Sequence, residues 1–102
     1  MFEDYYVHFD AQARLAILKS LAEQTDGRLN DALLKDILVE FGMNKSRDYI
    51  RTQLIWLRDQ GAAVTLKQVG TVMVATLTEQ GADHVSRVSI ISGVARPSLK
   101  RA

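Results

Sequence analysis

Apolar residues recur every three or four positions in three stretches of the first sixty residues, a spacing that predicts amphipathic helices. The first helix is expected to follow Asp10, whose carboxylate can accept from the free N–H groups of a first helical turn. The second is expected to follow a cap at Asn30. Its apolar stripe runs to Phe41, and Gly42 is placed to end it in a left-handed conformation.

The third helix is expected to begin after a cap at Ser46 and to end at Gly61. Only a tight connection, residues 43–45, separates it from the second. Two capped helices joined by a short turn containing glycine indicate a helix-turn-helix. The positions of the three helices that we expect to be buried are Leu15, Leu18, Leu21, Leu34, Ile37, Leu38, Ile50, Leu54 and Leu57.

After Gly61 the period of the pattern changes to two, which is typical of strands. Residues 63–67 and 72–77 are expected to pair as an antiparallel hairpin with Gly70 in the turn. Thr78 is expected to cap a short fourth helix that runs to about Ser86.

The predicted class is mainly α with a β-hairpin (α+β). Its architecture is a winged helix-turn-helix of three helices, a two-stranded wing and a short fourth helix. The predicted organisation is an N-terminal arm (1–9), a winged-helix domain (10–86) and a C-terminal tail (87–102).

The third helix and the hairpin carry a further pattern. Leu54 and Leu57 follow Arg51 at three-residue steps, and a glycine, a strand, a wing glycine and a closing Leu-Thr-x-x-Gly at 77–81 come next. This order resembles that of many winged-helix regulators over about residues 10–86. The resemblance implies the fold and assigns no function by itself.

The whole chain also resembles a family of small proteins of Mu-like phages and prophages. The matching stretches are 14–18 with 21–24, Ser46-Arg47-Asp48-x-x-Arg51-Thr52, and 93–97 in the tail. This resemblance implies a winged-helix protein of phage origin and carries over no activity.

Composition adds limits rather than chemistry. The chain has 102 residues, with 47% hydrophobic and 25% charged residues, which suits one soluble domain. The absence of cysteine excludes disulfides and thiolate chemistry. The acidic N-terminus lacks the basic and apolar regions of a signal peptide, so a cytoplasmic location is expected.

Charge is divided unevenly along the chain. Residues 1–40 hold eight acidic and four basic residues, whereas residues 41–102 hold nine basic and four acidic ones. Such asymmetry favours an anionic partner for the second half. The alternative is that the two halves complement each other within the fold.

The helix-turn-helix pattern indicates how that partner, double-stranded DNA, would be bound. Arg51 on the exposed side of the third helix is expected to fork onto a guanine edge, with Thr52 beside it. The expected phosphate and wing contacts are Lys45, Ser46, Arg47, Lys67 and Thr71. Many helix-turn-helix proteins read two half-sites as dimers, so a homodimer is a further expectation.

Other interpretations stay open. Arg47, Arg51 and Arg58 can be solvated surface charges, and Asp48 and Ile55 suit a DNA groove poorly. A protein-interaction module, for example in phage assembly, is therefore the alternative function, and a phage or host protein the alternative partner.

The aromatic residues are ambiguous as well. Trp56 and Tyr49 form either a partner surface or, as we expect for Trp56, packing beneath the wing or tail. Tyr5, Tyr6 and Phe9 can be an extra strand, a dimerisation arm or core filler.

No catalytic or cofactor motif is recognisable in the sequence. His8 and His84 have no second histidine or cysteine at metal-ligand spacing, and both are expected to be surface residues. No Ser-His-acid context or glycine-rich phosphate loop is present. The chain is therefore not expected to be an enzyme or to bind a cofactor or metal.

Overall fold

The first helix is longer than the sequence pattern predicted. The computed structural model of the chain describes residues 2–99, and helix α1 spans Phe2–Ala22. The predicted helix start at Asp10 is therefore wrong, because residues 4–9 contain no glycine or proline and continue the helix upstream. The Asp10 carboxylate instead accepts a hydrogen bond from the Tyr49 hydroxyl. Met1, the first residue of the predicted arm, lies outside the described residues.

The two helices of the predicted helix-turn-helix are α2 (Asp31–Glu40) and α3 (Arg47–Asp59). Both predicted caps are confirmed, since Asn30 Oδ1 accepts from the Leu33 N–H at 2.8 Å and Ser46 Oγ from the Tyr49 N–H at 3.1 Å. Gly42 has the expected positive φ of 80°. After α3 the left-handed residue is Ala62 rather than the predicted terminator Gly61.

The sheet has one more strand than predicted. Strands β1 (Arg28–Asn30), β2 (Val64–Val69) and β3 (Val72–Leu77) form an antiparallel sheet in the order β1-β3-β2. The hairpin of β2 and β3 is confirmed, and Val69 pairs with Val72 across a two-residue turn. Gly70 there has a φ of 59°, which glycine adopts without strain. The three residues of β1 were missed because they are too few to show a period.

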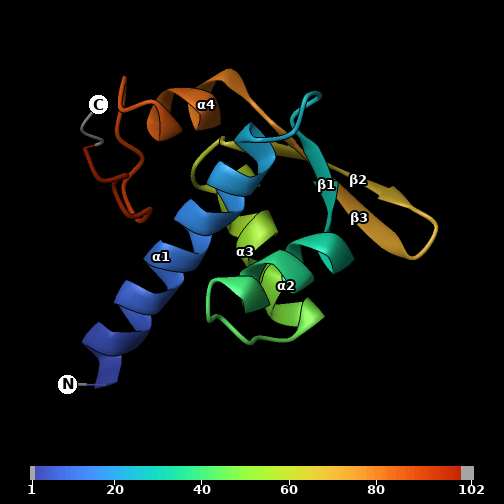
Figure 1. Cartoon of the computed structure of the whole chain (residues 1–102), viewed down its shortest axis with the longest axis horizontal. Helices are drawn as coiled ribbons and strands as arrows, with labels where there is room; N and C mark the ends of the chain where they lie inside the picture. Colours follow the sequence, from blue (N-terminus) through green and yellow to red (C-terminus); the bar gives the residue numbers. More distant parts are fainter. Residues whose placement is uncertain (1, 100–102) are drawn as a thin grey trace.

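The core lies where the three long helices meet the sheet (Figure 1). Every helical position predicted to be buried is buried except Ile37, which is half-buried. The buried residues of α2 are Asp31, Leu34 and Leu38, so Ile37 lies at the edge of its inward face. Within residues 2–99 the chain is an α+β fold of four helices and a three-stranded antiparallel sheet.

The segment after β3 packs back onto the helices. Helix α4 (Glu79–Val85) begins at the predicted cap, where Thr78 Oγ1 accepts from the Gly81 N–H at 3.2 Å. Residues 87–99, the described part of the predicted tail, form neither helix nor strand. The Ala95 N–H donates to the Ala11 carbonyl of α1 at 3.1 Å, so the tail is joined to the first helix. Residues 100–102 are outside the described part.

His84 is not the surface residue that the sequence suggested, because it is buried beneath the tail. Its Nδ1 accepts from the Ile91 N–H at 3.0 Å, and its Nε2 lies 2.8 Å from the Ala95 carbonyl. Since Nδ1 accepts, Nε2 must carry the proton, and the ring is held neutral between two backbone groups.

None of the helices in residues 2–99 combines the length and the apolar character needed to cross a bilayer.

Candidate nucleic-acid interface

Asp31 occupies the junction between α2, α3 and the β2–β3 hairpin, which is the predicted wing and is called the wing from here on. It is the first residue of α2 and its side chain has no solvent exposure. Strand β1 ends one residue earlier, at Asn30, which pairs with Val74 of β3. The neighbouring residue of β3, Met73, therefore finds no β1 partner for its backbone N–H. Asp31 Oδ1 accepts from this N–H at 3.1 Å. The carboxylate thus takes the place of the missing backbone acceptor at the end of the sheet.

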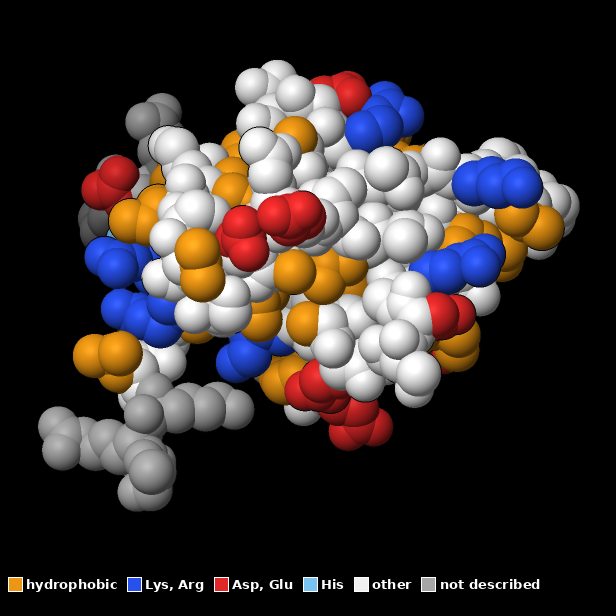
Figure 2. All heavy atoms as spheres, turned by 90° about the horizontal axis from the view of Figure 1, so that it is seen from above, with side chains coloured by type: hydrophobic (Ala, Val, Ile, Leu, Met, Phe, Trp, Pro, Cys, Tyr) orange, Lys and Arg blue, Asp and Glu red, His pale blue; other side chains and the backbone are white. Residues whose placement is uncertain are grey.

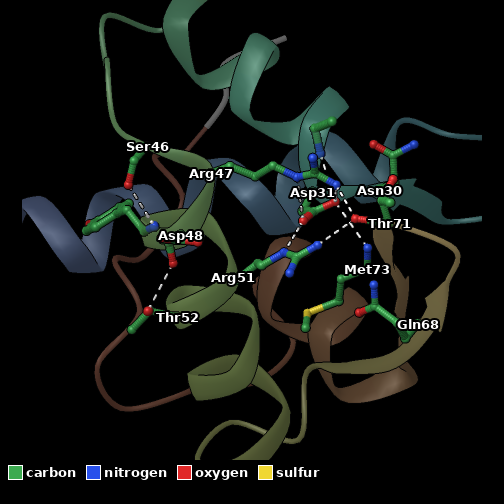
Figure 3. Close-up of polar contacts among 12 residues, drawn as sticks. Asn30, Asp31, Ser46, Arg47, Asp48, Arg51, Thr52, Gln68, Thr71 and Met73 are labelled. Atoms are coloured by element: carbon green, nitrogen blue, oxygen red, sulfur yellow. Dashed lines mark hydrogen bonds and ion pairs between the residues drawn. The ribbon is translucent and has the colours of Figure 1, made fainter.

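Two arginines of α3 complete the Asp31 site. Arg47 Nε donates to Oδ2 of Asp31 at 2.9 Å, and Arg51 Nε donates to the same oxygen. One Nη2 N–H of each arginine donates to the carbonyl of Thr71 in the hairpin turn. Figure 3 shows both guanidinium groups between Asp31 and Thr71. One buried carboxylate therefore links α2, α3 and the wing. We call Asp31, Arg47 and Arg51 together the Asp31 cluster.

The ionised form of Asp31 is strongly favoured. Burial by itself raises the pKa of a carboxyl group, but hydrogen bonds from Arg47, Arg51 and the Met73 N–H outweigh it. Together they lower the pKa of Asp31 to about 2. This carboxylate carries a full negative charge between two positive ones, so the cluster has a net charge of +1.

These contacts change the roles available to the two arginines. An arginine forks onto guanine with two N–H groups aligned. In Arg51, Nε and one N–H of Nη2 already donate to Asp31 and Thr71, so a fork onto a base would have to use Nη1 and the second N–H of Nη2. The side chains of Arg47 and Arg51 remain 37% and 31% exposed, and their contacts with Asp31 and Thr71 use Nε and Nη2 rather than Nη1.

Lys45 lies on the other side of the helix-turn-helix, against aromatic rings. Its Nζ is 4.9 Å from the ring centroid of Phe9 and 5.4 Å from that of Tyr49, distances that suit cation–π attraction. Burial, and then the hydrogen bond to the Asp10 carboxylate, raise the pKa of Tyr49 well above its ordinary value. Lys45 is therefore held against Phe9 of α1. The Ser46 hydroxyl accepts the hydrogen bond that caps α3.

The exposed side of α3 is not basic. Thr52 is exposed and donates its hydroxyl to the Asp48 carbonyl at 3.0 Å. Arg58 pairs with its neighbour Asp59 at 2.7 Å. Asp48 and Ile55 are also exposed on this helix. Of the residues predicted to face DNA from this helix, only Thr52 takes no part in the contacts with Asp31, and its hydroxyl is bonded within the helix.

The wing presents a third group of predicted residues. Lys67 on β2 and Thr71 in the turn are exposed, as expected for contacts with a duplex. The Thr71 carbonyl is engaged by the two arginines, whereas the residue itself is exposed. Lys67 is thus the cation of the wing that has no part in the Asp31 cluster.

The surface as a whole carries mixed charge. Figure 2 shows one face, on which basic and acidic side chains of the described residues alternate with neutral and apolar surface. Within residues 2–99, no three His, Cys, Asp or Glu side chains form a group that could hold a metal ion.

Curated relatives of the chain come from a phage and a bacterium. The chain is 38% identical to "Uncharacterized protein gp26" of Escherichia phage Mu over 84 residues, which cover 82% of this chain and 85% of the phage protein. The chain belongs to the family of phage Mu gp26. An uncharacterized protein of Haemophilus influenzae is 34% identical over 67 residues, 66% of this chain and 65% of that protein.

The gp26 relationship confirms the resemblance to Mu-like phage proteins seen in the sequence. No protein-family model and no solved structure matches the chain significantly. The relatives' names state no activity, so the residues of this gp26 family member must carry any functional argument.

The key residue of the site, Asp31, was missed by sequence reasoning. An acidic residue directly after a helix cap is common, because it also complements the helix dipole, and such a residue is usually exposed. The one available signal was the pair of arginines at 47 and 51. Their four-residue spacing places both on one face of α3, where they can share a single acceptor.

Proposed function

We propose that this gp26 family member is a winged-helix protein that binds double-stranded DNA through α3 and the β2–β3 wing. The winged-helix assignment is supported by the order α1-β1-α2-α3-β2-β3 and by the sheet order β1-β3-β2. A capped helix after a short turn, followed directly by a hairpin, is the arrangement in which a recognition helix and a wing can meet one duplex.

The observation that carries the proposal is the position of Arg47 and Arg51 between α3 and the wing turn. A phosphate backbone passing over this junction would meet the Nη1 groups of both arginines. The wing would add Lys67 and the Thr71 hydroxyl. The Asp31 cluster fixes the wing against α3 before binding, which reduces the entropy lost on association.

In this proposal few residues of the protein can read the base sequence of the DNA. Thr52 lies on the outward side of α3 and can reach a base edge. Arg51 is a phosphate contact and a positioning residue for the wing, rather than the guanine reader expected from sequence. Lys45 and Ser46 contribute through the start of α3, where the backbone N–H groups favour a phosphate.

The test is a mobility-shift titration of the purified protein on duplex DNA at two salt concentrations. Lys67→Ala should weaken binding to all duplexes and reduce the slope of log K against log salt by about 1, because one phosphate contact is lost. Arg96→Ala removes the same charge from the tail, which Figure 1 shows at the opposite end from the wing. This control should leave the slope unchanged.

Two results would refute DNA binding by this surface. One is the absence of any shift at low salt. The other is an equal loss for Lys67→Ala and Arg96→Ala, which would indicate unspecific attraction between a basic protein and DNA. Folding of each variant is checked by circular dichroism before the titration.

A second candidate function is a protein-interaction module, for instance in phage assembly. It is favoured by the exposed side of α3, where Asp48, Ile55 and Asp59 offer an acidic and apolar surface. Ile55→Lys separates the two candidates. It should strengthen duplex binding if α3 faces DNA and abolish partner binding if α3 faces a protein.

We further propose that the protein is not an enzyme and acts in the cytoplasm on phage or prophage DNA, as a transcriptional regulator or another DNA-transaction factor. Both nitrogens of His84, the buried histidine, are engaged by the tail backbone, which supports a structural role for it.

A further inference from the structure

The first two turns of α1 extend past the rest of the molecule. Figure 1 shows this end of the helix beyond α2 and α3. Three consecutive large side chains there are mostly exposed: Tyr5 is 60% exposed, Tyr6 57% and Val7 67%. A short helical end without tertiary contacts is marginally stable in water, and apolar side chains add a cost of exposure.

A pocket opens on the same side of α1, further along the helix. It has a volume of about 160 Å³ and is lined by Gln12, Leu15, Ala16, Lys19, Phe41 and Met43. At 100° per residue, Tyr5 lies within about 40° of Gln12, Ala16 and Lys19 around the helix axis. Tyr6 lies about 100° from Tyr5 around the axis, but the two rings meet edge to face with their centroids 5.3 Å apart. Val7 lies about 160° from Tyr5. Tyr5 and the pocket therefore share one face of α1.

A dimer with a two-fold axis would bury the exposed Tyr5 and fill the pocket at the same time. The pocket is centred about ten residues, or about 15 Å, from Tyr5 along α1. If two α1 helices pack antiparallel about a point near residues 10–12, each Tyr5 reaches the pocket of the other copy. An isologous interface requires such a self-complementary surface, with a projection and a receptor on the same face.

The positions of two charged residues on α1 also favour an antiparallel pair of α1 helices. Asp4 is exposed near the start of α1 and Lys19 is exposed near its end. In the antiparallel arrangement the midpoint between these two positions lies at residues 11–12, so Asp4 of one copy lies level with Lys19 of the other, at the edge of the face that carries Tyr5. A parallel pair would instead bring like charges together.

We propose that the exposed face of α1 binds a second copy of this chain, with the two α1 helices antiparallel and Tyr5 inserted into the partner's pocket between α1 and Phe41. This surface is separate from the α3–wing junction. The inference therefore does not depend on DNA binding, and its test contains no DNA.

The experiment is sedimentation equilibrium of the full chain over a series of concentrations. The wild type should shift towards twice the mass of one chain as the concentration rises. Tyr5→Ser should raise the dimer dissociation constant by about tenfold or more, as expected for a central aromatic anchor. Val7→Ser is the control, because Val7 is an apolar residue of similar exposure on the opposite side of α1 from Tyr5. It should leave the constant within about twofold.

A charge reversal tests the antiparallel orientation. Lys19→Glu should weaken the dimer, and Asp4→Lys combined with Lys19→Glu should restore it. All four positions are exposed, so each variant is expected to fold, and circular dichroism checks this.

Three outcomes overturn the proposal. They are a wild type that is monomeric at every concentration, equal effects of Tyr5→Ser and Val7→Ser, and a double variant that does not recover. A monomeric wild type would leave this face of α1 to a different protein. Failure of duplex binding in the separate titration would leave the dimer result unaffected.

Discussion

A buried polar side chain contributes to the attachment of each of two segments, the wing and the tail, and the two side chains differ in kind. The wing is held by Asp31, a buried carboxylate that contacts two arginines and one backbone N–H. The tail is held by His84, a neutral ring that contacts only backbone groups. Both side chains satisfy backbone groups that the sheet and helices leave unpaired.

The difference has energetic consequences. Removing Asp31 leaves two positive groups close together without their counter-charge, whereas removing His84 leaves two uncharged backbone groups. The wing should therefore depend on charge and respond to acid, and the tail should depend on hydrogen bonding and packing. Four measurements test this contrast, from the largest expected effect to the smallest.

The largest effect is expected from Asp31→Ala. Breaking a buried charge cluster from one side costs roughly 3–5 kcal/mol, and the partial exposure of both arginines keeps the loss near the lower limit. We expect unfolding free energy to fall by about 3 kcal/mol in urea titrations. A loss as small as that of a typical surface substitution would show that the cluster does not hold the fold together.

Acid should weaken the wing attachment in a definite pH range. The folded pKa of Asp31, about 2, lies below its ordinary value of 3.8. The stabilisation is therefore complete above about pH 4 and is lost as the pH falls through about 2. The expected loss is about 2 kcal/mol. Asp31→Asn should flatten the stability curve in this range, and an unchanged curve would assign the acid response to other carboxylates.

A smaller and more local effect is expected from His84→Gln. Glutamine can keep one of the two backbone contacts, so we expect a loss of about 1 kcal/mol. Hydrogen exchange should quicken at the Ile91 amide and stay unchanged at the Met73 amide of the wing. Faster exchange at both amides would mean that wing and tail open together, contrary to the comparison.

No measurable effect on stability is expected from Arg58→Ala. Arg58 and its partner Asp59 are both exposed, and such pairs are screened by water and salt. The urea midpoint of this variant should match the wild type. A clear shift would show that exposed pairs on α3 stabilise it as the Asp31 cluster does, and the distinction between buried and exposed charge would fail.

The asymmetry of charge along the sequence is explained in part by the cluster. The sequence left open whether the acidic first half and basic second half complement each other within the fold. Asp31 with Arg47 and Arg51, and Asp10 with Tyr49, are internal contacts between the halves. Lys67 lies outside these contacts, and its role towards an anionic partner stays a prediction.

The packing of Trp56 was also predicted only in part from the sequence. The expectation that it lies beneath the wing or tail is confirmed for the tail, where Gly93 approaches the indole ring so closely that a side chain there would collide with it. The guanidinium of Arg14 stacks on the indole at 3.8 Å and donates to the Gly93 carbonyl at 2.9 Å. The sequence contains no sign of this role for Arg14.

The sequence by itself determined the features that depend on near neighbours. The caps at Asn30, Ser46 and Thr78 each bond an N–H three residues away, and the turn at Gly70 needs only its own φ. The helical and strand periods likewise identified the core and the hairpin. These signals lie within a few residues of one another, so they can be read along the chain.

Only the tertiary structure decided the features that join distant positions. Asp31 bonds Arg47 at a separation of 16 residues and the Met73 N–H at 42, and Arg14 bonds Gly93 at 79. The strand β1 exists because β3 lies beside it. A charged or polar side chain has the same local pattern whether it is exposed or buried, because its partner comes from another element of the fold.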